Sequence, residues 1–494
     1  MNKECDVVVI GGGGSGLTAA VRCAQKSGKR VIVLEKAGST GGGMRMASTM
    51  RTFRSKWQKE RNIKDVTDAY LRKVMQDSYW RIDKDLAREA ILATGEFFDW
   101  FLEIAGSEHG DKFHVGRYVF DDENGQEGPQ MGGPGGVTGG GRLFMDELTR
   151  LCGDYGVEVL TRHKATQISK EADGIKVAAE GKNGEVIIDC QSIIIASGSW
   201  INNEAVVKRI CPDLHEAMKH MGTSPHTNPN YTGDAFELTK ELDLMHDEAN
   251  YTIRMMGPMV FSKAETLPAM ADSPFSVMVN KEAGRFACEP TQPNMGVFNS
   301  GLVMMEQPEG LAYIIFDTAN LEAAIADDKA NPRQSFCRAI PVMPFPESAQ
   351  AAREQIEAAA KKEKGIYIAD TVEELANAMG LSAKSLKNTI DAYNSYCEDG
   401  FDRECFKDKK YLVPMTKAPF YGVYGMLGTD GAFGGISVNS HMQALKEDGS
   451  VMENVYVTGD FASGRFINKG GEKVQILNDM SWALASGFIA GSNA

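Results

Sequence analysis

Short apolar runs and helical segments alternate along the first part of the chain. Val7–Ile10, residues 31–34 and residues 193–200 are apolar runs that end in glycine, acidic or small residues, a pattern that predicts buried strands. The alanine-rich residues 17–26 lie between the first two runs and predict a helix. A strand, a helix and a second strand in this order predict two parallel strands joined by a crossover helix.

The rest of the chain also alternates between helical and strand-like segments. Helices are predicted at residues 65–104, 142–155, 372–379, 383–396 and 482–490. A small antiparallel sheet is predicted from residues 157–160, 175–178 and 186–189, and a last strand from residues 455–460. Methionine, proline and glycine become frequent after about residue 252, which suggests a separate unit there.

Glycines mark the turn between the first strand and the first helix. Gly11, Gly13 and Gly16 fit the pattern G-x-G-x-x-G, which allows a tight turn, a close approach to a pyrophosphate and close helix packing. Glu35 ends the second strand, where a carboxylate can accept both ribose hydroxyls and repel a 2′-phosphate. The helix N-terminus offers free N–H groups to phosphates. The segment therefore predicts a dinucleotide site, and a glycine-rich turn without cofactor is the alternative.

Composition and charge exclude several classes of partner. A chain of 494 residues with 43% hydrophobic and 24% charged residues predicts a soluble globular protein of two domains. A net charge of −14 argues against nucleic acid and anionic membranes as partners. No apolar stretch reaches the roughly 18 residues of a transmembrane segment, and no targeting signal precedes the first strand. We therefore expect a cytoplasmic protein.

Cysteine and histidine spacing predicts neither a disulfide framework nor a metal site. The nine cysteines show no C-x-x-C spacing, which indicates reduced thiols and excludes c-type haem attachment. The eight histidines form no ligand cluster, so we predict no protein-bound metal.

Four separated motifs occur together in this chain: the glycine turn with Glu35, residues 41–43, residues 196–198 and residues 458–460, with glycine pairs at 434–435 and 470–471. Together they resemble the flavoproteins of the fumarate reductase/succinate dehydrogenase family, which includes urocanate reductase and the 3-ketosteroid dehydrogenases. The resemblance implies an α/β fold with a Rossmann-like FAD-binding domain and an inserted α+β cap domain. The FAD-binding domain would be discontinuous, over residues 1–252 and 431–494, with the cap at residues 253–430.

The resemblance also implies FAD held without a covalent bond. Succinate dehydrogenases tether FAD through a histidine just after the second strand, and residues 41–50 contain none. The residues assigned to the cofactor are Gly11, Gly13, Gly14, Ser15, Gly16, Glu35, Lys36, Gly42, Gly43, Ala47, Ser48, Ala165, Ala196, Ser197, Gly198, Gly459, Asp460 and Gly471.

Three positions depart from the fumarate reductases. The cap arginine that donates the proton there is replaced by residues 290–293, which read Pro-Thr-Gln-Pro. The histidine before the glycine pair 434–435 is missing, and the arginine before the last glycine pair is replaced near Asn468 and Lys469. The resemblance therefore predicts a substrate other than fumarate.

Four residues are candidates for contacts with the substrate. Residues 419–435 resemble a run of the 3-ketosteroid dehydrogenases in which a tyrosine polarises the ketone, so Tyr421 is the first candidate acid, with a core tyrosine as the alternative. Tyr118 is a second candidate hydroxyl. Arg254 and Arg465 are candidates for binding an acidic substrate group, with ion pairs as the alternative.

These observations predict an FAD-dependent ene-reductase. It would transfer a hydride from reduced flavin to a C=C bond conjugated to a ketone or carboxylate of a small-molecule substrate. Without a haem motif, electrons would come from an external donor, either NAD(P)H or a carrier protein. The alternatives are a ketosteroid dehydrogenase-like enzyme that desaturates a ketone, and a non-catalytic FAD-bound sensor.

Overall fold

A six-stranded sheet, which we call the central sheet, is built from strands of the first and the last parts of the sequence. The computed structural model describes residues 1–47, 50–119, 125–130, 140–171, 173–182, 184–218, 228–260, 262–289, 297–330, 345–469 and 472–494. The strand order is β17-β18-β10-β2-β3-β6, in which β17 is antiparallel to β18 and the others are parallel. The strands are β2 (Val7–Ile10), β3 (Val31–Glu35), β6 (Glu158–Thr161), β10 (Ser192–Ile195), β17 (Gln443–Leu445) and β18 (Val451–Val457).

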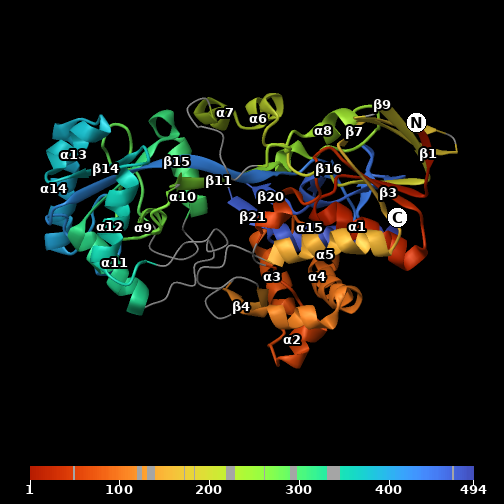
Figure 1. Cartoon of the computed structure of the whole chain (residues 1–494), viewed down its shortest axis with the longest axis horizontal. Helices are drawn as coiled ribbons and strands as arrows, with labels where there is room; N and C mark the ends of the chain where they lie inside the picture. Colours follow the sequence, from red (N-terminus) through yellow and green to blue (C-terminus); the bar gives the residue numbers. More distant parts are fainter. Residues whose placement is uncertain are drawn as a thin grey trace.

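Helices bury the central sheet, as parallel strands of continuous valine and isoleucine require. Every residue of β2, β3 and β10 is buried. Helix α1 (Gly14–Ser27) packs against the last helix, α15 (Asp479–Asn493). A Cβ on Gly487 would lie 2.3 Å from the Ser15 carbonyl oxygen, so the two helices can touch only because α15 has glycine there. The predicted βαβ unit is confirmed, and the last helix of the chain, α15, packs on it (Figure 1).

A four-stranded sheet lies beside the central sheet, in the order β1-β9-β8-β7. The predicted membership of this sheet is wrong in one respect, because residues 157–160 belong to β6, which pairs with β3 in the central sheet. Sequence periodicity cannot tell which sheet a short apolar strand joins. The strands of the four-stranded sheet are β1 (Asn2–Glu4), β7 (His163–Glu171), β8 (Gly174–Gly181) and β9 (Gly184–Cys190).

A third sheet, which we call the cap sheet, is built around one long strand, β15 (Phe420–Phe433). Figure 1 shows β15 as a blue ribbon that runs from the helices at the left toward β11 in the middle. It pairs with β11 (Thr252–Met259), β13 (Ala312–Asp317) and β14 (Ile366–Ala369), and β12 (Val277–Val279) extends the sheet beyond β13. The predicted helices at 372–379 and 383–396 are α13 (Val372–Met379) and α14 (Ala383–Asp399).

The remaining helices and strands surround these sheets. Helix α4 packs against α15, and α3 and α4 lie within the helical stretch predicted at 65–104. The remaining helices and strands are α2 (Lys56–Glu60), α3 (Thr67–Asp77), α4 (Lys84–Ala105), β4 (His114–Val119), β5 (Gly125–Gln130), α5 (Gly140–Asp154), α6 (Glu204–Ile210), α7 (Pro212–Met218), α8 (Asp234–Leu238), α9 (Thr266–Ala271), α10 (Val297–Met305), α11 (Thr318–Ala330), α12 (Ala349–Ala360), β16 (Ile436–Ser437), β19 (Ala462–Ser463), β20 (Phe466–Lys469) and β21 (Glu472–Gln475).

The glycine pair at the end of β15 fixes the passage from the cap sheet to the central sheet. The Gly434 N–H donates to the Asp460 carbonyl (2.8 Å), and the Gly434 carbonyl accepts from the Trp200 indole (2.9 Å). The Gly435 N–H donates to the Ser463 hydroxyl (2.9 Å), and the Gly435 carbonyl accepts from the Tyr251 hydroxyl (3.2 Å). Since all four backbone groups are bonded, this passage is held in one geometry.

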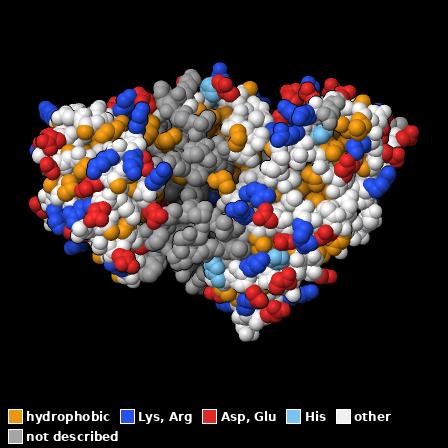
Figure 2. Space-filling model, in the orientation of Figure 1, with side chains coloured by type: hydrophobic (Ala, Val, Ile, Leu, Met, Phe, Trp, Pro, Cys, Tyr) orange, Lys and Arg blue, Asp and Glu red, His pale blue; other side chains and the backbone are white. Residues whose placement is uncertain are grey.

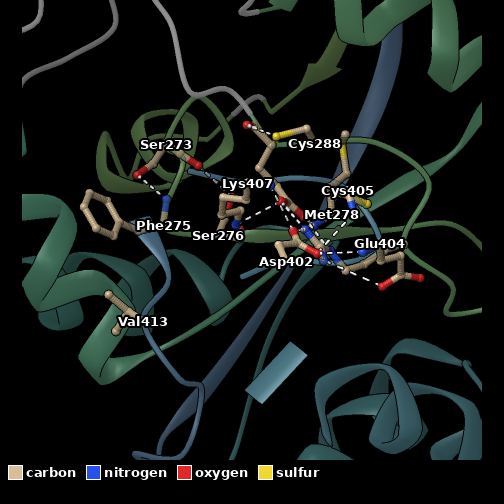
Figure 3. A network of polar contacts seen from close by, with 12 residues as sticks. Ser273, Phe275, Ser276, Met278, Cys288, Asp402, Glu404, Cys405, Lys407 and Val413 are labelled. Atoms are coloured by element: carbon tan, nitrogen blue, oxygen red, sulfur yellow. Dashed lines mark hydrogen bonds and ion pairs between the residues drawn. The ribbon is translucent and has the colours of Figure 1, made fainter. Parts of the chain in front are cut away.

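A buried network of charges stabilises the other end of the cap sheet (Figure 3). Arg285 contacts Glu289 (2.8 Å) and Asp402 (2.9 Å), and Lys407 contacts Glu289 (2.9 Å). All four side chains are fully buried. Burial alone would raise the pKa of the Glu289 carboxyl, but Lys407 and Arg285 lower it below its ordinary value. Glu289 also accepts the Met278 N–H (2.9 Å), so the network is joined to β12.

Charged side chains of both signs are mixed over the described part of the visible surface (Figure 2). The net charge of −14 is therefore not gathered into one acidic face in this view. Among the described residues, no helix is both long and apolar enough to cross a bilayer.

Candidate cofactor and substrate site

The turn between β2 and α1 is shaped by glycines. Gly11 has a φ of +115°, and a Cβ there would lie 2.2 Å from the Ala196 carbonyl oxygen. A Cβ on Gly16 would lie 1.9 Å from the Gly11 carbonyl oxygen. Both positions exclude any side chain, because real Cβ atoms do not approach so closely. The turn therefore brings β2, α1 and the end of β10 into direct contact.

The N-terminus of α1 is free to bind an anion. Its N-cap is Gly13, no side chain caps the helix, and no acidic residue lies in the first turn. A Cβ on Gly13 would have no atom within 4 Å, so there is open space on that side. Unsatisfied N–H groups at a helix N-terminus bind phosphate well. The geometry fits the pyrophosphate of FAD, to which Gly13, Gly14, Ser15 and Gly16 would present their backbone.

Glu35 is held at the end of β3 by backbone donors. One carboxylate oxygen accepts the Gly12 N–H (2.8 Å) and the other accepts the Ala37 N–H (2.6 Å). The side chain is 9% exposed. Each oxygen keeps a lone pair with which it can accept a ribose hydroxyl. The fixed orientation is what a bidentate contact to the FAD ribose needs.

Replacing Glu35 with alanine should weaken FAD retention. The ribose of FAD would lose two charge-assisted hydrogen bonds to the carboxylate, so we expect FAD affinity to fall by about 10- to 100-fold. Measuring the ratio of flavin to protein absorbance after gel filtration checks this. Full FAD occupancy in the variant would contradict the ribose assignment.

Lys36 contacts the protein and not open space. Its ammonium binds Asp234 (2.6 Å) and the Thr232 hydroxyl (2.6 Å), and Lys164 approaches the same carboxylate at 3.1 Å. Burial would raise the pKa of Asp234, but Lys36 and Lys164 lower it below its ordinary value. The Lys36 ammonium therefore fastens the start of α8 to the end of β3, and its contact with the cofactor stays a prediction.

The second glycine segment lies against the first. The Gly41 N–H donates to the Gly12 carbonyl (2.9 Å), and Gly42 has a φ of +54°. A Cβ on Gly43 would lie 1.9 Å from the Tyr231 hydroxyl oxygen. The same ring is 3.4 Å from the Cβ position of Gly198. Tyr231 thus spans two predicted cofactor segments, and the sequence analysis missed it because one loop tyrosine carries no pattern.

The motif at residues 458–460 is fastened to α1 and α15. Gly459 has a φ of +73°, and a Cβ there would lie 2.6 Å from the Ser15 hydroxyl oxygen. Its N–H donates to Ser486 (3.0 Å) and its carbonyl accepts from the Trp482 indole (2.8 Å). These contacts place Asp460 next to the N-terminus of α1, at the carboxyl edge of the central sheet.

The other predicted cofactor residues lie after β10, in β7, after the second glycine segment, or outside the described part. Ala196 is buried, and the Ser197 hydroxyl is buried without a partner among the described residues, so it is free to bind a ligand. Ala165 is buried in β7, and Ala47 follows the second glycine segment. Ser48 and Gly471 lie outside the described residues.

Two of the four candidate substrate residues meet at one carboxylate. Arg254 of β11 contacts Asp479 (2.6 Å), and Arg465 contacts the other oxygen of the same carboxylate. Asp479 is the first residue of α15, so the contact joins the cap sheet to the FAD-binding part. We call Arg254, Arg465, Asp479 and Asp460 the arginine cluster, since the Arg465 Nη1 lies 3.9 Å from Asp460.

Arg465 is buried in an aromatic environment. It is 1% exposed, and its guanidinium lies 4.8 Å from the ring centre of Phe433 and 4.6 Å from that of Phe466. Its Nε donates to the Leu477 carbonyl (3.0 Å). Its Nη1 has no hydrogen-bond partner among the described residues. A buried donor without a partner is costly, so it points to a ligand oxygen at this place.

Tyr421 is not brought to the arginine cluster. Tyr421 is 1% exposed and stacks on Phe316 between β13 and β14. Gly431, which pairs with Arg254, is ten positions farther along β15; that length of strand spans roughly 30 Å. Tyr421 therefore lies in the core of the cap sheet, which is the alternative given for it above, and its hydroxyl has no hydrogen-bond partner among the described residues. Tyr118 lies in β4, and its side chain is outside the described part.

Comparisons with known proteins identify the family and the fold. A family model described as the FAD binding domain matches residues 6–471. The vinyl phenol reductase of Lactiplantibacillus plantarum is 25% identical, over 93% of this chain and 90% of that protein. The open conformation of a flavocytochrome c3 fumarate reductase has a TM-score of 0.73 at 20% identity, over 99% of this chain and 78% of that one. The 3-ketosteroid Δ1-dehydrogenase from Sterolibacterium denitrificans has a TM-score of 0.70 at 16% identity, over 99% of both chains.

The last two similarities show the fold, and the family model shows the family. The predicted fold class, a Rossmann-like FAD-binding part with an inserted α+β cap, is confirmed. Because the family model spans nearly the whole chain, the protein belongs to the FAD-dependent flavoproteins of the fumarate reductase/succinate dehydrogenase family, binds FAD and is a flavin-dependent oxidoreductase.

Proposed function

We propose that this protein is an ene-reductase that reduces a C=C bond conjugated to a carbonyl group, on a substrate other than fumarate. The observation that carries the proposal is the Arg465 Nη1, a buried donor without a partner among the described residues, next to the cofactor segment at Asp460. A carbonyl oxygen there would accept the hydrogen bond that this nitrogen does not make within the described chain.

Bound reduced FAD would supply the hydride for the β-carbon of the substrate. Negative charge then develops on the carbonyl oxygen, and Arg465 would stabilise it through Nη1. Asp479 and the Leu477 carbonyl hold the guanidinium in place, so little reorganisation accompanies the reaction. Phe433 and Phe466 would pack beside an apolar or aromatic substrate. The α-carbon would then take a proton, which completes the saturated product.

Two further lines support a substrate other than fumarate. The relative from Lactiplantibacillus plantarum is named for the reduction of vinyl phenols, in which an aromatic ring is conjugated to the C=C bond. The chain also lacks the three residues with which fumarate reductases handle a dicarboxylate, as described above.

The proposal includes three predictions from the sequence. The FAD-binding domain would comprise residues 1–252 and 431–494, with the cap at 253–430. The FAD would be bound without a covalent link, and electrons would come from NAD(P)H or a separate carrier protein.

Acid precipitation tests the predicted mode of FAD binding. Since residues 41–50 contain no histidine, we expect all FAD in the supernatant after denaturation in trichloroacetic acid. Flavin absorbance of the supernatant and of the washed pellet gives the distribution. Yellow protein in the pellet would contradict the prediction.

A screen of electron acceptors tests the proposed function. The enzyme is reduced with dithionite-treated methyl viologen, and consumption of the viologen is followed with aryl enones, steroid enones, aryl acrylates and fumarate. We expect turnover with an enone or aryl acrylate and none with fumarate. Fumarate as the best acceptor would overturn the substrate assignment. Turnover of saturated ketosteroids with an oxidising dye, without any reduction of enones, would favour the dehydrogenase instead.

A further inference from the structure

We propose that Asp479 sets the substrate class of this enzyme and selects a neutral carbonyl, such as an aryl or alkenyl ketone, over a free carboxylate. This inference rests on the proposed function, because it concerns the group that activates the C=C bond. It goes further in naming that group and the residue that selects it.

Asp479 forms ion pairs with both arginines, Arg254 and Arg465. One of its oxygens binds Arg465 and the other binds Arg254 at 2.6 Å. The Arg254 side chain is 16% exposed and the Arg465 side chain 2% exposed, so both guanidinium groups are largely removed from water. A carboxylate that accepts hydrogen bonds from two guanidinium groups at once neutralises positive charge that would otherwise bind an anionic substrate.

The four described side chains of the arginine cluster carry balanced charges among themselves. Arg254 and Arg465 contribute two positive charges, and Asp460 and Asp479 contribute two negative charges. A second carboxylate from a substrate would enter beside two existing ones, and like charges in a partly buried site repel strongly. A neutral carbonyl oxygen needs only a donor, and the Arg465 Nη1 provides one.

The surroundings of Arg465 favour the same class. Phe433 is 3% exposed and Phe466 is 5% exposed, and both rings face the guanidinium. Aromatic walls lower the local polarity, which strengthens a hydrogen bond to a neutral acceptor and raises the cost of burying another charge.

Two matched substrates isolate the activating group. Benzylideneacetone and cinnamate share the phenyl ring and the C=C bond, and differ in carrying a methyl ketone or a carboxylate. The measured quantity is the ratio of kcat/KM for the ketone to that for cinnamate, with reduced methyl viologen as the electron donor. For the wild-type enzyme we expect a ratio of at least about ten, since one unfavourable charge interaction is worth about that or more.

Two variants of Asp479 then separate charge from structure. Asp479→Asn removes the negative charge, so we expect the ratio to fall about tenfold or more, mainly through a lower KM for cinnamate. Asp479→Glu keeps the charge and should leave the ratio within about threefold of wild type. FAD content and thermal melting verify that both variants fold, and cinnamate binding to the oxidised enzyme, followed by flavin absorbance, gives a readout that does not need turnover.

The outcomes distinguish this inference from the proposed function. A wild-type preference for cinnamate, or an unchanged ratio in a folded Asp479→Asn variant, would overturn the inference and leave the ene-reductase proposal intact. Reduced wild-type enzyme that neither compound nor any other conjugated alkene in the screen reoxidises would overturn the proposed function itself.

Discussion

Replacing Arg465 with methionine should slow the reoxidation of reduced enzyme by a conjugated ketone by about 100-fold or more. The variant loses the buried donor proposed to stabilise the developing oxyanion, and removal of one such donor costs this much in other enzymes. Methionine keeps most of the apolar volume between Phe433 and Phe466. Anaerobic stopped-flow absorbance of the flavin measures the rate directly.

Two control variants give this prediction its contrast. Arg465→Lys keeps the positive charge without the planar fork, and we expect an intermediate rate. Tyr421→Phe alters the other candidate, which lies in the core of the cap sheet, and should leave the rate unchanged. A slow Tyr421→Phe variant together with a normal Arg465→Met variant would show that the roles of the two residues are reversed.

Glu289→Gln should lower the free energy of unfolding by about 3 kcal/mol or more. The change removes the carboxylate that Arg285 and Lys407 share. Arg285 keeps its contact with Asp402, but the two buried cations lose one compensating negative charge, which is strongly destabilising in a protein interior. Urea denaturation followed by fluorescence measures the loss. Glu404→Gln is the matched control: Glu404 lies 3.6 Å from Arg285 but is 39% exposed, so a small change is expected there.

The effect of Glu289 should depend on pH. The pKa of this carboxyl is lower in the folded protein than its ordinary value, so its stabilisation is present above the unfolded pKa of about 4.3. It is lost as the pH falls through the lower folded pKa. Wild type and Glu289→Gln should therefore differ most near neutral pH and converge in acid. A difference that grows as the pH falls would contradict this assignment.

The dinucleotide site could be predicted from the sequence because its signals are local. Gly11, Gly16 and Glu35 act through the backbone geometry of one short βαβ unit, and the structure shows the close approaches that require glycine. The predicted bounds of the neighbouring strands also agree with the structure to within one residue.

The substrate side depends on contacts between residues far apart in the chain. Arg254, Arg465 and Asp479 meet across more than 200 residues, and no spacing rule links them. Tyr421 was favoured by a local motif, but the pairing of β15 with β13 and β14 decides that it lies in the cap core. Tyr231 and the charge network around Glu289 were missed for the same reason, since their partners are distant in sequence.

The most direct test of the central claim is anaerobic mixing of the reduced enzyme with benzylideneacetone. Our account predicts that the absorbance of oxidised flavin returns within seconds, with formation of one equivalent of the saturated ketone per flavin. A reduced flavin that stays bleached with this ketone, with aryl acrylates and with steroid enones would contradict the account.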